Sequence, residues 1–335
     1  MTKILKRLNS MLYDVELKLR GYIVMPYYIY IARNKGEYIA DKDWDNLIIL
    51  DACRYDTFVE VSGINCPYII SRGSHTVEFL EENFVGRKFN DIVYVTANPQ
   101  VNIHAKDCFY KIIPVWKYEW DESLNTVLPQ AVYKYAIEAE QKYPNKRLIV
   151  HFIQPHIPFL DYPELSVYGI KKDYLLAMNK KPNFKTTNPW DEAARGNIDA
   201  RIIWEAYKKN LKRVLPYALK LTKKLTGKCV ITADHGEALR RIWFPVPVRI
   251  AEHPQYVHIP DLVKVPWYEV DKGERKKIDY NTTEEREKVR CIVRKLVAKG
   301  GQYEGNNNNK SHLSVSWIWR DGKILLQLSQ TLNQI

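Results

Sequence analysis

The chain has 335 residues, of which 46% are hydrophobic and 27% charged, and this composition is typical of a globular protein with room for a large core. The length fits one large domain or two small ones. The net charge of +12 favours an anionic partner, either a substrate or a membrane surface, while an uneven coat of lysines is the other interpretation. The basic residues are scattered without a DNA- or RNA-binding motif, so no nucleic-acid partner is expected.

Residues 1–40 form the first expected unit. Apolar residues recur there at helical spacing with basic residues between them: Ile4, Leu8, Met11, Val15 and Leu19. The segment 21–32 then reads GYIVMPYYIYIA. A basic amphipathic helix followed by a tyrosine-rich apolar segment suits a membrane interface, whereas a helix packed on the globular body is the competing interpretation.

The compartment follows from cysteines and apolar segments. Five cysteines occur without a CxxC pair, which favours a reducing compartment. Neither a cleavable signal peptide nor an apolar stretch of the ~20 residues needed to span a bilayer is found. We therefore expect a cytoplasmic protein, with peripheral attachment to the membrane as the open alternative.

Residues 41–303 are expected to form an α/β catalytic domain. Short apolar runs bounded by polar residues predict buried strands over 46–50, 91–96, 147–152, 228–232 and 265–270. Helical periodicity lies between them over 78–84, 129–141 and 201–225. This alternation predicts a doubly wound, mostly parallel sheet. Residues 161–195 lack clear periodicity and are expected to form a long irregular insertion over the sheet edge.

Residues 304–335 are expected to form a linker and a β-hairpin tail. A run of asparagines occupies 306–309, and two alternating segments follow it. Asp321-Gly322 stands between those segments, and Asp-Gly is a strong hairpin-turn signal.

Polar groups stand at the ends of four predicted strands: Asp51, Asn98, His151 with His156, and Asp234 with His235. In doubly wound sheets, ligands bind beyond the C-terminal ends of the strands. Carboxylates and imidazoles gathered there suit a divalent cation. A single aspartate after a strand is often a helix cap, but several such groups at one sheet edge favour a metal site.

These segments resemble those of the alkaline phosphatase and sulfatase superfamily, in the same order along the chain. TADHGE (232–237) is similar to the metal-binding signature, which implies Asp234 and His235 as ligands, and LDACRYD (50–56) resembles the first-strand segment, which implies Asp51. SRGSHT (71–76) is similar to the SxGSWT segment of phosphatase-like members, whose threonine is the nucleophile. That similarity implies Thr76 as both nucleophile and ligand.

Two later segments extend the resemblance. QPHIPF (154–159) resembles a segment in which a histidine contacts the ester, implying His156. EHPQYVHIPDLVKVPW (252–267) is similar to a late segment with a histidine before a VP-containing strand, implying His253. The resemblance covers about 45–270 and implies an alkaline-phosphatase-like fold.

Two departures narrow the expected chemistry. The chain has no CxPSR motif, so a hydroxyl nucleophile is favoured over formylglycine. Two-zinc members carry an aspartate four residues before the middle histidine, where this chain has Phe152. The resemblance therefore implies one divalent ion (Zn, Mn, Mg or Ca), with a second left open and His156 and His253 standing where it would lie.

Several of these residues have more than one possible role. Arg54 could fork onto an anion's oxygens or pair with Asp56. His156 or His253 could protonate the leaving oxygen. Thr76 could be only a helix N-cap, with Ser74 as the rival nucleophile. His151 is interpreted as a core histidine, and Asn98 as a turn residue before Pro99.

The expected function is that of a metal-dependent hydrolase or transferase acting on a phosphate mono- or diester through Thr76. The expected partner is an anionic ester, and the positive net charge favours esters of lipid head groups or of polymers. A sulfatase-like hydrolase without formylglycine is one alternative, and a non-catalytic binding protein that kept the fold is the other.

Overall fold

The computed structural model describes all residues except 1–2, 166–168, 185–187, 281–311, 321–322 and 332–335. The chain divides into two compact units, Met1–Thr282 and Thr283–Ile335. Segment 1–40 belongs to the first unit, while the linker and the Asp321-Gly322 turn predicted from the sequence lie outside the described residues.

The first unit is built on a six-stranded sheet with the order β12-β8-β1-β7-β3-β4. Its strands are β1 (Asn46–Leu50), β3 (Phe89–Thr96), β4 (Phe109–Pro114), β7 (Arg147–Phe152), β8 (Cys229–Thr232) and β12 (Tyr268–Val270). All neighbours pair in parallel except β12, which runs antiparallel to β8. β1 and β8 are buried along their whole length, as expected for strands covered on both faces.

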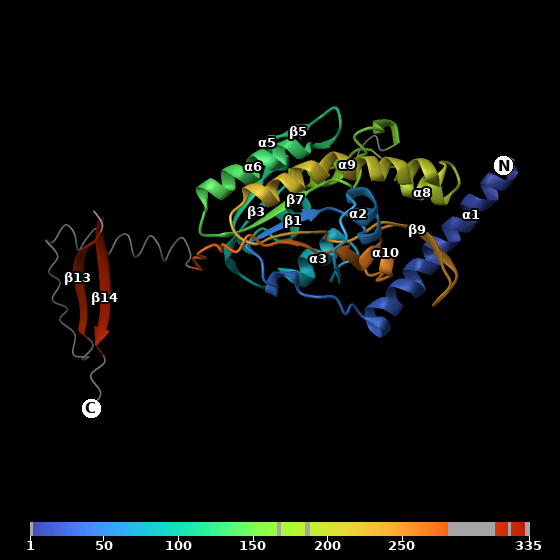
Figure 1. The fold of residues 1–335 in the computed structure, drawn as a ribbon. Helices are drawn as coiled ribbons and strands as arrows, with labels where there is room; N and C mark the ends of the chain where they lie inside the picture. Colours follow the sequence, from blue (N-terminus) through green and yellow to red (C-terminus); the bar gives the residue numbers. More distant parts are fainter. Residues whose placement is uncertain (1–2, 166–168, 185–187, 281–311, 321–322, 332–335) are drawn as a thin grey trace. The chain divides into compact units, whose positions relative to one another are not determined.

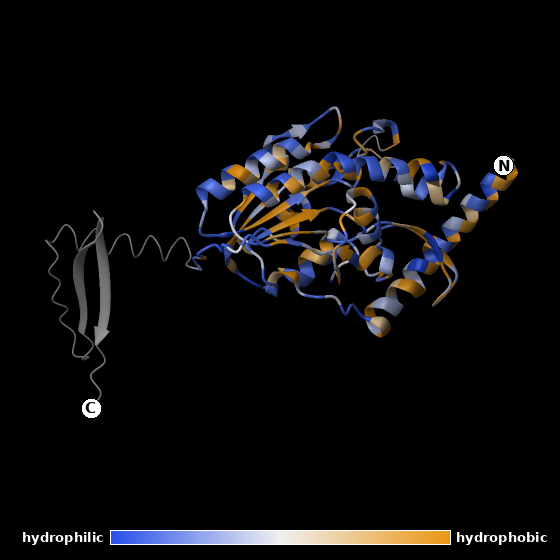
Figure 2. Ribbon diagram, in the orientation of Figure 1, coloured by the Kyte–Doolittle hydropathy of each residue, from blue (hydrophilic) through white to orange (hydrophobic). Residues whose placement is uncertain are grey.

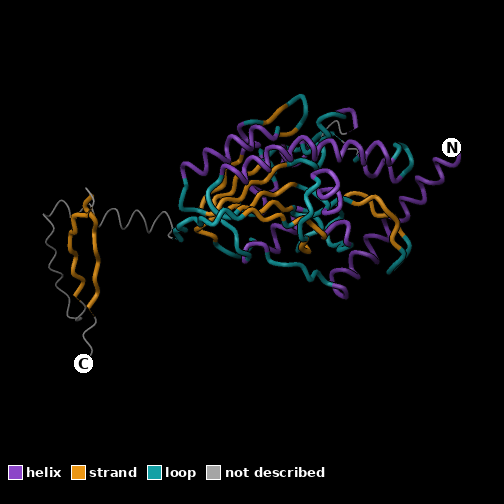
Figure 3. Tube along the Cα trace, viewed as in Figure 1, coloured by secondary structure: helices purple, strands orange, loops and turns teal. Residues whose placement is uncertain are grey.

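Helices cover both faces of this sheet. α6 (Pro129–Lys142) and α9 (Ala200–Lys224) lie together over one face, and α3 (Thr76–Asn83) lies on the other (Figure 1). The strand layer between the two helical layers is also visible in Figure 3. The predicted α/β fold with a mostly parallel sheet is therefore confirmed.

The other helices and strands of the first unit lie outside this sheet and the three helices named above. The helices are α1 (Lys3–Leu19), η1 (Arg20–Val24), η2 (Tyr27–Ala32), η3 (Ile39–Asp41), α2 (Tyr55–Ser62), α4 (Gln100–His104), α5 (Val115–Tyr118), η4 (Pro163–Leu165), α7 (Lys171–Ala177), α8 (Pro189–Ala194) and α10 (Pro260–Val263). The small sheets pair β2 (Tyr68–Ile70) with β11 (Lys264–Pro266), β5 (Trp120–Asp121) with β6 (Thr126–Val127), and β9 (Ala238–Ile242) with β10 (Val248–Glu252).

Two sequence expectations need correction. The single strand expected over 265–270 is divided at Trp267, because β11 pairs with β2 whereas β12 pairs with β8. The segment 161–195 is not wholly irregular, since α7 and α8 form within it. These helices have 7 and 6 residues, too short to give a clear periodic pattern.

The N-terminal helix α1 is present and packs beside β10 (Figure 1). Tyr13 is fully buried, and the Glu16 carboxylate forms ion pairs with Arg249 and Arg241. Among the described helices, none combines the length and apolar character needed to cross a bilayer.

The second unit contains the predicted β-hairpin. β13 (His312–Arg320) pairs with β14 (Lys323–Thr331) in antiparallel register, from His312 opposite Thr331 to Arg320 opposite Lys323.

Candidate metal centre

Three ligands predicted from the sequence meet at the C-terminal edge of the parallel sheet. Asp51 directly follows β1, and Asp234 and His235 follow β8, its neighbour in the sheet. All three are buried, and one donor atom from each lies within 4.8 Å of the others. Two carboxylates and one imidazole form a group that can hold a metal ion, and this group is called cluster one below.

The turn after β1 carries backbone strain at this site. Ala52 has φ of 59°, in the left-handed region that non-glycine residues rarely adopt. Its N–H donates to Asp234 Oδ1 at 3.0 Å, and its carbonyl accepts from the Tyr207 hydroxyl at 2.6 Å. These bonds hold Asp51 and Asp234 in place, and strain of this kind concentrates at functional sites.

Thr76 lies against cluster one. Its Oγ1 is 2.8 Å from Asp234 Oδ2 and 3.2 Å from His235 Nε2. Thr76 is the first residue of α3 rather than its N-cap, because the ring of His75 caps the helix by accepting from Val77 N–H at 3.1 Å. The hydroxyl of Thr76 is therefore not used in capping and faces the carboxylates.

Ser74, the rival nucleophile, lies in a different network. Its hydroxyl has one proton to donate, with Glu78 Oε2 and Pro254 O as acceptors both at 2.9 Å, and it accepts from Val257 N–H at 3.1 Å. Glu78 also pairs with His258 at 2.6 Å. Ser74 thus joins α3 to the segment 254–258 and is not part of the metal-ligand clusters.

A second cluster lies beside the first. His156, Glu237 and His253 bring one donor atom each within 4.8 Å of one another, and His253 Nδ1 is 2.8 Å from Glu237 Oε1. The His253 ring centroid is 4.5 Å from that of His235 in cluster one. This group, called cluster two, offers three possible ligands, of which only the two histidines were predicted from the sequence.

Each cluster contains a carboxylate oxygen that has no hydrogen-bond partner in the described part of the chain. Among the described residues, Asp51 Oδ1 and Glu237 Oε2 are buried and have no hydrogen-bond partner. An unpartnered buried carboxylate oxygen is costly unless a cation or proton neutralises it. One such oxygen in each cluster fits a cation in each, with ligands that suit zinc or manganese.

Burial sets the charge states of cluster two. Burial lowers the pKa of His156 and of His253, so both imidazoles are neutral at pH 7, which is the form that binds metals. Burial raises the pKa of Glu237 to about 8. A bound cation would favour the ionised carboxylate, since metal binding displaces protons from ligands.

The pKa of Asp51 shifts in the opposite direction. Burial alone would raise it, but the neighbouring imidazoles of His151, His156 and His235 lower the pKa of Asp51 below its usual range. Asn98 Nδ2 also donates to Asp51 Oδ2 at 2.6 Å. Asp51 is therefore held as a carboxylate.

Two residues that contact the ligand Asp51 were given other roles from the sequence. His151 is a fully buried core residue, but its Nε2 is 3.4 Å from Asp51 Oδ2 and its Nδ1 is 3.0 Å from the Tyr94 hydroxyl. Asn98 makes the expected turn bond to Gln100 N–H at 2.9 Å while its amide reaches Asp51. Partners of this kind orient metal ligands.

Arg54 makes the contact expected under the alternative interpretation. Its Nε and Nη2 atoms form a fork onto Asp56, and Nη1 donates to Asp261 at 2.8 Å and to Glu237 O at 2.9 Å. These acceptors raise the pKa of Arg54 against the effect of burial. A contact of Arg54 with a substrate anion remains a prediction and would require it to leave Asp56.

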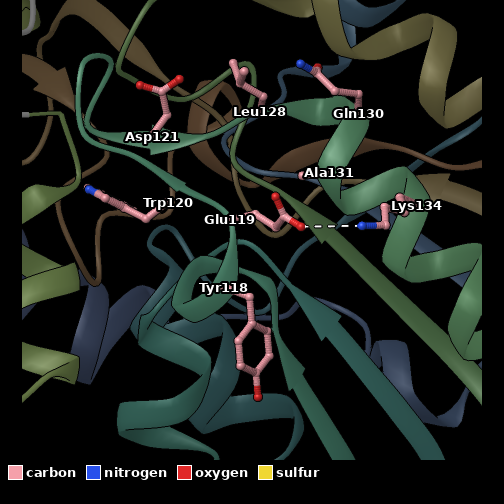
Figure 4. A pocket seen from close by; sticks show the side chains of 8 residues that line it. All are labelled: Tyr118, Glu119, Trp120, Asp121, Leu128, Gln130, Ala131 and Lys134. Carbon is pink, nitrogen blue, oxygen red and sulfur yellow. Dashed lines mark ion pairs between the residues drawn. The ribbon is translucent and has the colours of Figure 1, made fainter.

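A surface pocket lies elsewhere on the molecule. Figure 4 shows its lining by α5, β5 and the N-terminal part of α6, where Lys134 pairs with Glu119. The two charged groups are 3.6 Å apart. The pocket shares no residue with the two clusters.

The sequence matches no protein-family model and none of the curated proteins with which it was compared. Among solved structures, it is similar to the integral membrane protein lipooligosaccharide phosphoethanolamine transferase A from Neisseria meningitidis, with 12% identity and a TM-score of 0.41. The match covers 75% of this chain and 50% of that protein. The chain thus spans about half the length of that transferase.

Proposed function

We propose that the chain is a metal-dependent hydrolase or transferase of phosphate esters, with Thr76 as the nucleophile. The observation that carries the proposal is the Thr76 hydroxyl, 2.8 Å from Asp234 and 3.2 Å from His235. Cluster two provides a second group of ligands next to it. A hydroxyl nucleophile beside a cation site suits in-line transfer of a phosphoryl group.

A cation in cluster one would lower the pKa of the Thr76 hydroxyl and offset charge on the phosphoryl oxygens. Thr76 Oγ1 forms a bond to phosphorus as the bond from phosphorus to the ester oxygen breaks, and the hydroxyl proton leaves along the hydrogen bond toward Asp234. The departing alkoxide takes a proton from water. Water or an acceptor alcohol then attacks phosphorus and gives its own proton to solvent, and the released Thr76 oxygen takes back the proton held by Asp234.

The test is a substrate screen on the full chain. Nitrophenyl phosphate monoester, bis-nitrophenyl phosphate and nitrophenyl sulfate are each assayed with zinc, manganese, magnesium and calcium. Asp234→Asn should lose most bound metal and nearly all phosphatase turnover. The matched control is Asp43→Asn, because Asp43 is exposed and pairs with Arg275 away from the site.

The nucleophile is tested by trapping. A slowly hydrolysed phosphate ester, quenched in acid and mapped by peptide mass spectrometry, should label Thr76. A label on Ser74, turnover of the sulfate alone, or full activity of metal-depleted Asp234→Asn would contradict the proposal.

A further inference from the structure

Helix α1 contacts the body of the protein through polar and aromatic side chains. Arg249 Nη1 donates to Asn9 Oδ1 at 2.7 Å, Tyr13 OH donates to Asp191, and Glu16 pairs with Arg249. Asn9, Tyr13 and Glu16 follow helical spacing and mark one face of α1. Hydrogen bonds and ion pairs therefore hold this face of the helix together with apolar packing, because Tyr13 belongs to a buried apolar cluster against which Leu17 packs.

The other face of α1 is apolar and points away from the protein. Its residues are Ile4, Leu8, Met11, Leu12 and Val15, which together with Tyr22 on η1 we call the apolar stripe. Their exposed fractions run from 50% for Leu8 to 81% for Tyr22. Figure 2 shows apolar positions recurring along α1. A continuous exposed apolar surface of this kind marks an interaction site.

Aromatic residues extend the stripe. Tyr30 is 73% exposed at the end of η2, and Trp243 and Phe244 in the β9–β10 turn are 76% and 66% exposed. The rings of Tyr27 and Phe244 meet edge to face at 5.1 Å, so the turn and the N-terminal segment lie side by side. Tyrosine and tryptophan are enriched where protein meets lipid head groups.

Charge distinguishes between the occupants that could cover this face. Lys6, Arg7 and Lys18 of α1 are exposed, whereas Asp14 on the same helix is neutralised by its ion pair with Arg195. A second copy of the chain would bring like charges together, whereas an anionic bilayer would complement them. Aliphatic side chains flanked by cations and aromatic rings are the pattern of an interfacial helix.

We propose that the apolar stripe, with Trp243 and Phe244, docks this protein on the surface of an anionic lipid bilayer. α1 would lie in the plane of the interface, with the stripe among the acyl chains and Asn9, Tyr13 and Glu16 still bound to the body. The inference does not depend on the proposed phosphate chemistry, because it rests on surface residues outside both clusters.

The test is flotation of the full chain with vesicles of phosphatidylcholine alone or mixed with phosphatidylglycerol. The protein should float with the anionic vesicles, and raising the salt concentration should weaken binding. Leu12→Glu and Tyr22→Glu should each reduce partitioning ~10-fold, as loss of one buried apolar side chain implies. Tyr118→Glu is the matched control, because Tyr118 on α5 is 60% exposed outside the stripe and should bind like the unaltered chain.

Circular dichroism and phosphatase activity should be unchanged in all three variants, since the replaced side chains are exposed. Equal flotation of Leu12→Glu, Tyr22→Glu and Tyr118→Glu would overturn the proposal, as would equal binding to neutral vesicles. Sedimentation velocity tests the alternative that a second copy of the chain covers the apolar stripe. A dimer that fails to float, and that Leu12→Glu converts to monomer, would show that the stripe is an interface between copies.

Discussion

Asn210 anchors the loop that carries His156, and its replacement should be costly. It lies on α9 with 2% exposure. Its Nδ2 donates to the carbonyls of Pro155, His156 and Pro158 at 2.9–3.1 Å, while Oδ1 accepts from Leu160 N–H at 3.1 Å. The side chain has two N–H groups and one carbonyl oxygen, so Asn210→Ala removes about three hydrogen bonds. At about 1 kcal/mol each, the loss is about 3 kcal/mol of unfolding free energy.

Urea unfolding of metal-free protein measures this loss without interference from bound cations. The midpoint should fall while the slope is unchanged, because the surface exposed on unfolding is the same. The control is the exposed Asn197, whose amide bonds Glu192 at 2.7 Å; Asn197→Ala should change stability by less than ~0.5 kcal/mol. A loss below about 1 kcal/mol for Asn210→Ala would refute the reasoning that this loop is held by one buried amide.

Three further perturbations have defined outcomes. Thr76→Ala should abolish turnover while metal stays bound, whereas Thr76→Ser should keep part of the activity; equal loss in both, measured with metal content, would argue against an oxygen nucleophile. The hydrogen bonds from Arg249 and Arg241 to Glu16 outweigh burial and lower the pKa of Glu16 below 4.5, so their contribution is present above that pH and lost as the pH falls further. Hydrogen exchange over 3–19 should rise below pH 4.5 in the unaltered chain, and Glu16→Gln should remove that dependence. Gly236→Ala would place a Cβ 2.2 Å from Asp261 O, so thermal stability and bound metal should both fall as His235 and Glu237 shift; an unchanged melting temperature would contradict this.

The sequence was most informative where strands end. β1 and β7 form over the predicted ranges, 46–50 and 147–152, because continuous apolar runs in a parallel sheet are bounded by the polar residues that follow them. Asp51 and Asp234 were placed together for the same reason. At these residues the local sequence pattern and the topology of the sheet predict the same position.

Residues placed by tertiary contacts could not be found in this way. Glu237 stands in the quoted TADHGE segment, but its contact with His253 depends on β9 and β10 returning to the site. His75 resembles any histidine before a helix, yet its ring stacks 6.1 Å from His235. Asn210 falls on the buried side of α9, where an apolar pattern gives no reason to expect an amide.

A metal ion bound by Asp51 and Asp234 would also make the lifetime of this protein depend on the cell's supply of that metal. Both carboxylates are buried, and one oxygen of each lies within 4.8 Å of the other. Without a metal ion, the fold therefore keeps two like charges close together and away from water, which destabilises it. A cation that binds only the folded chain stabilises it by about 2.7 kcal/mol at one hundred times its dissociation constant. Metal starvation would then raise the unfolded population and its proteolysis, and the amount of protein as well as its activity would report on the available cation.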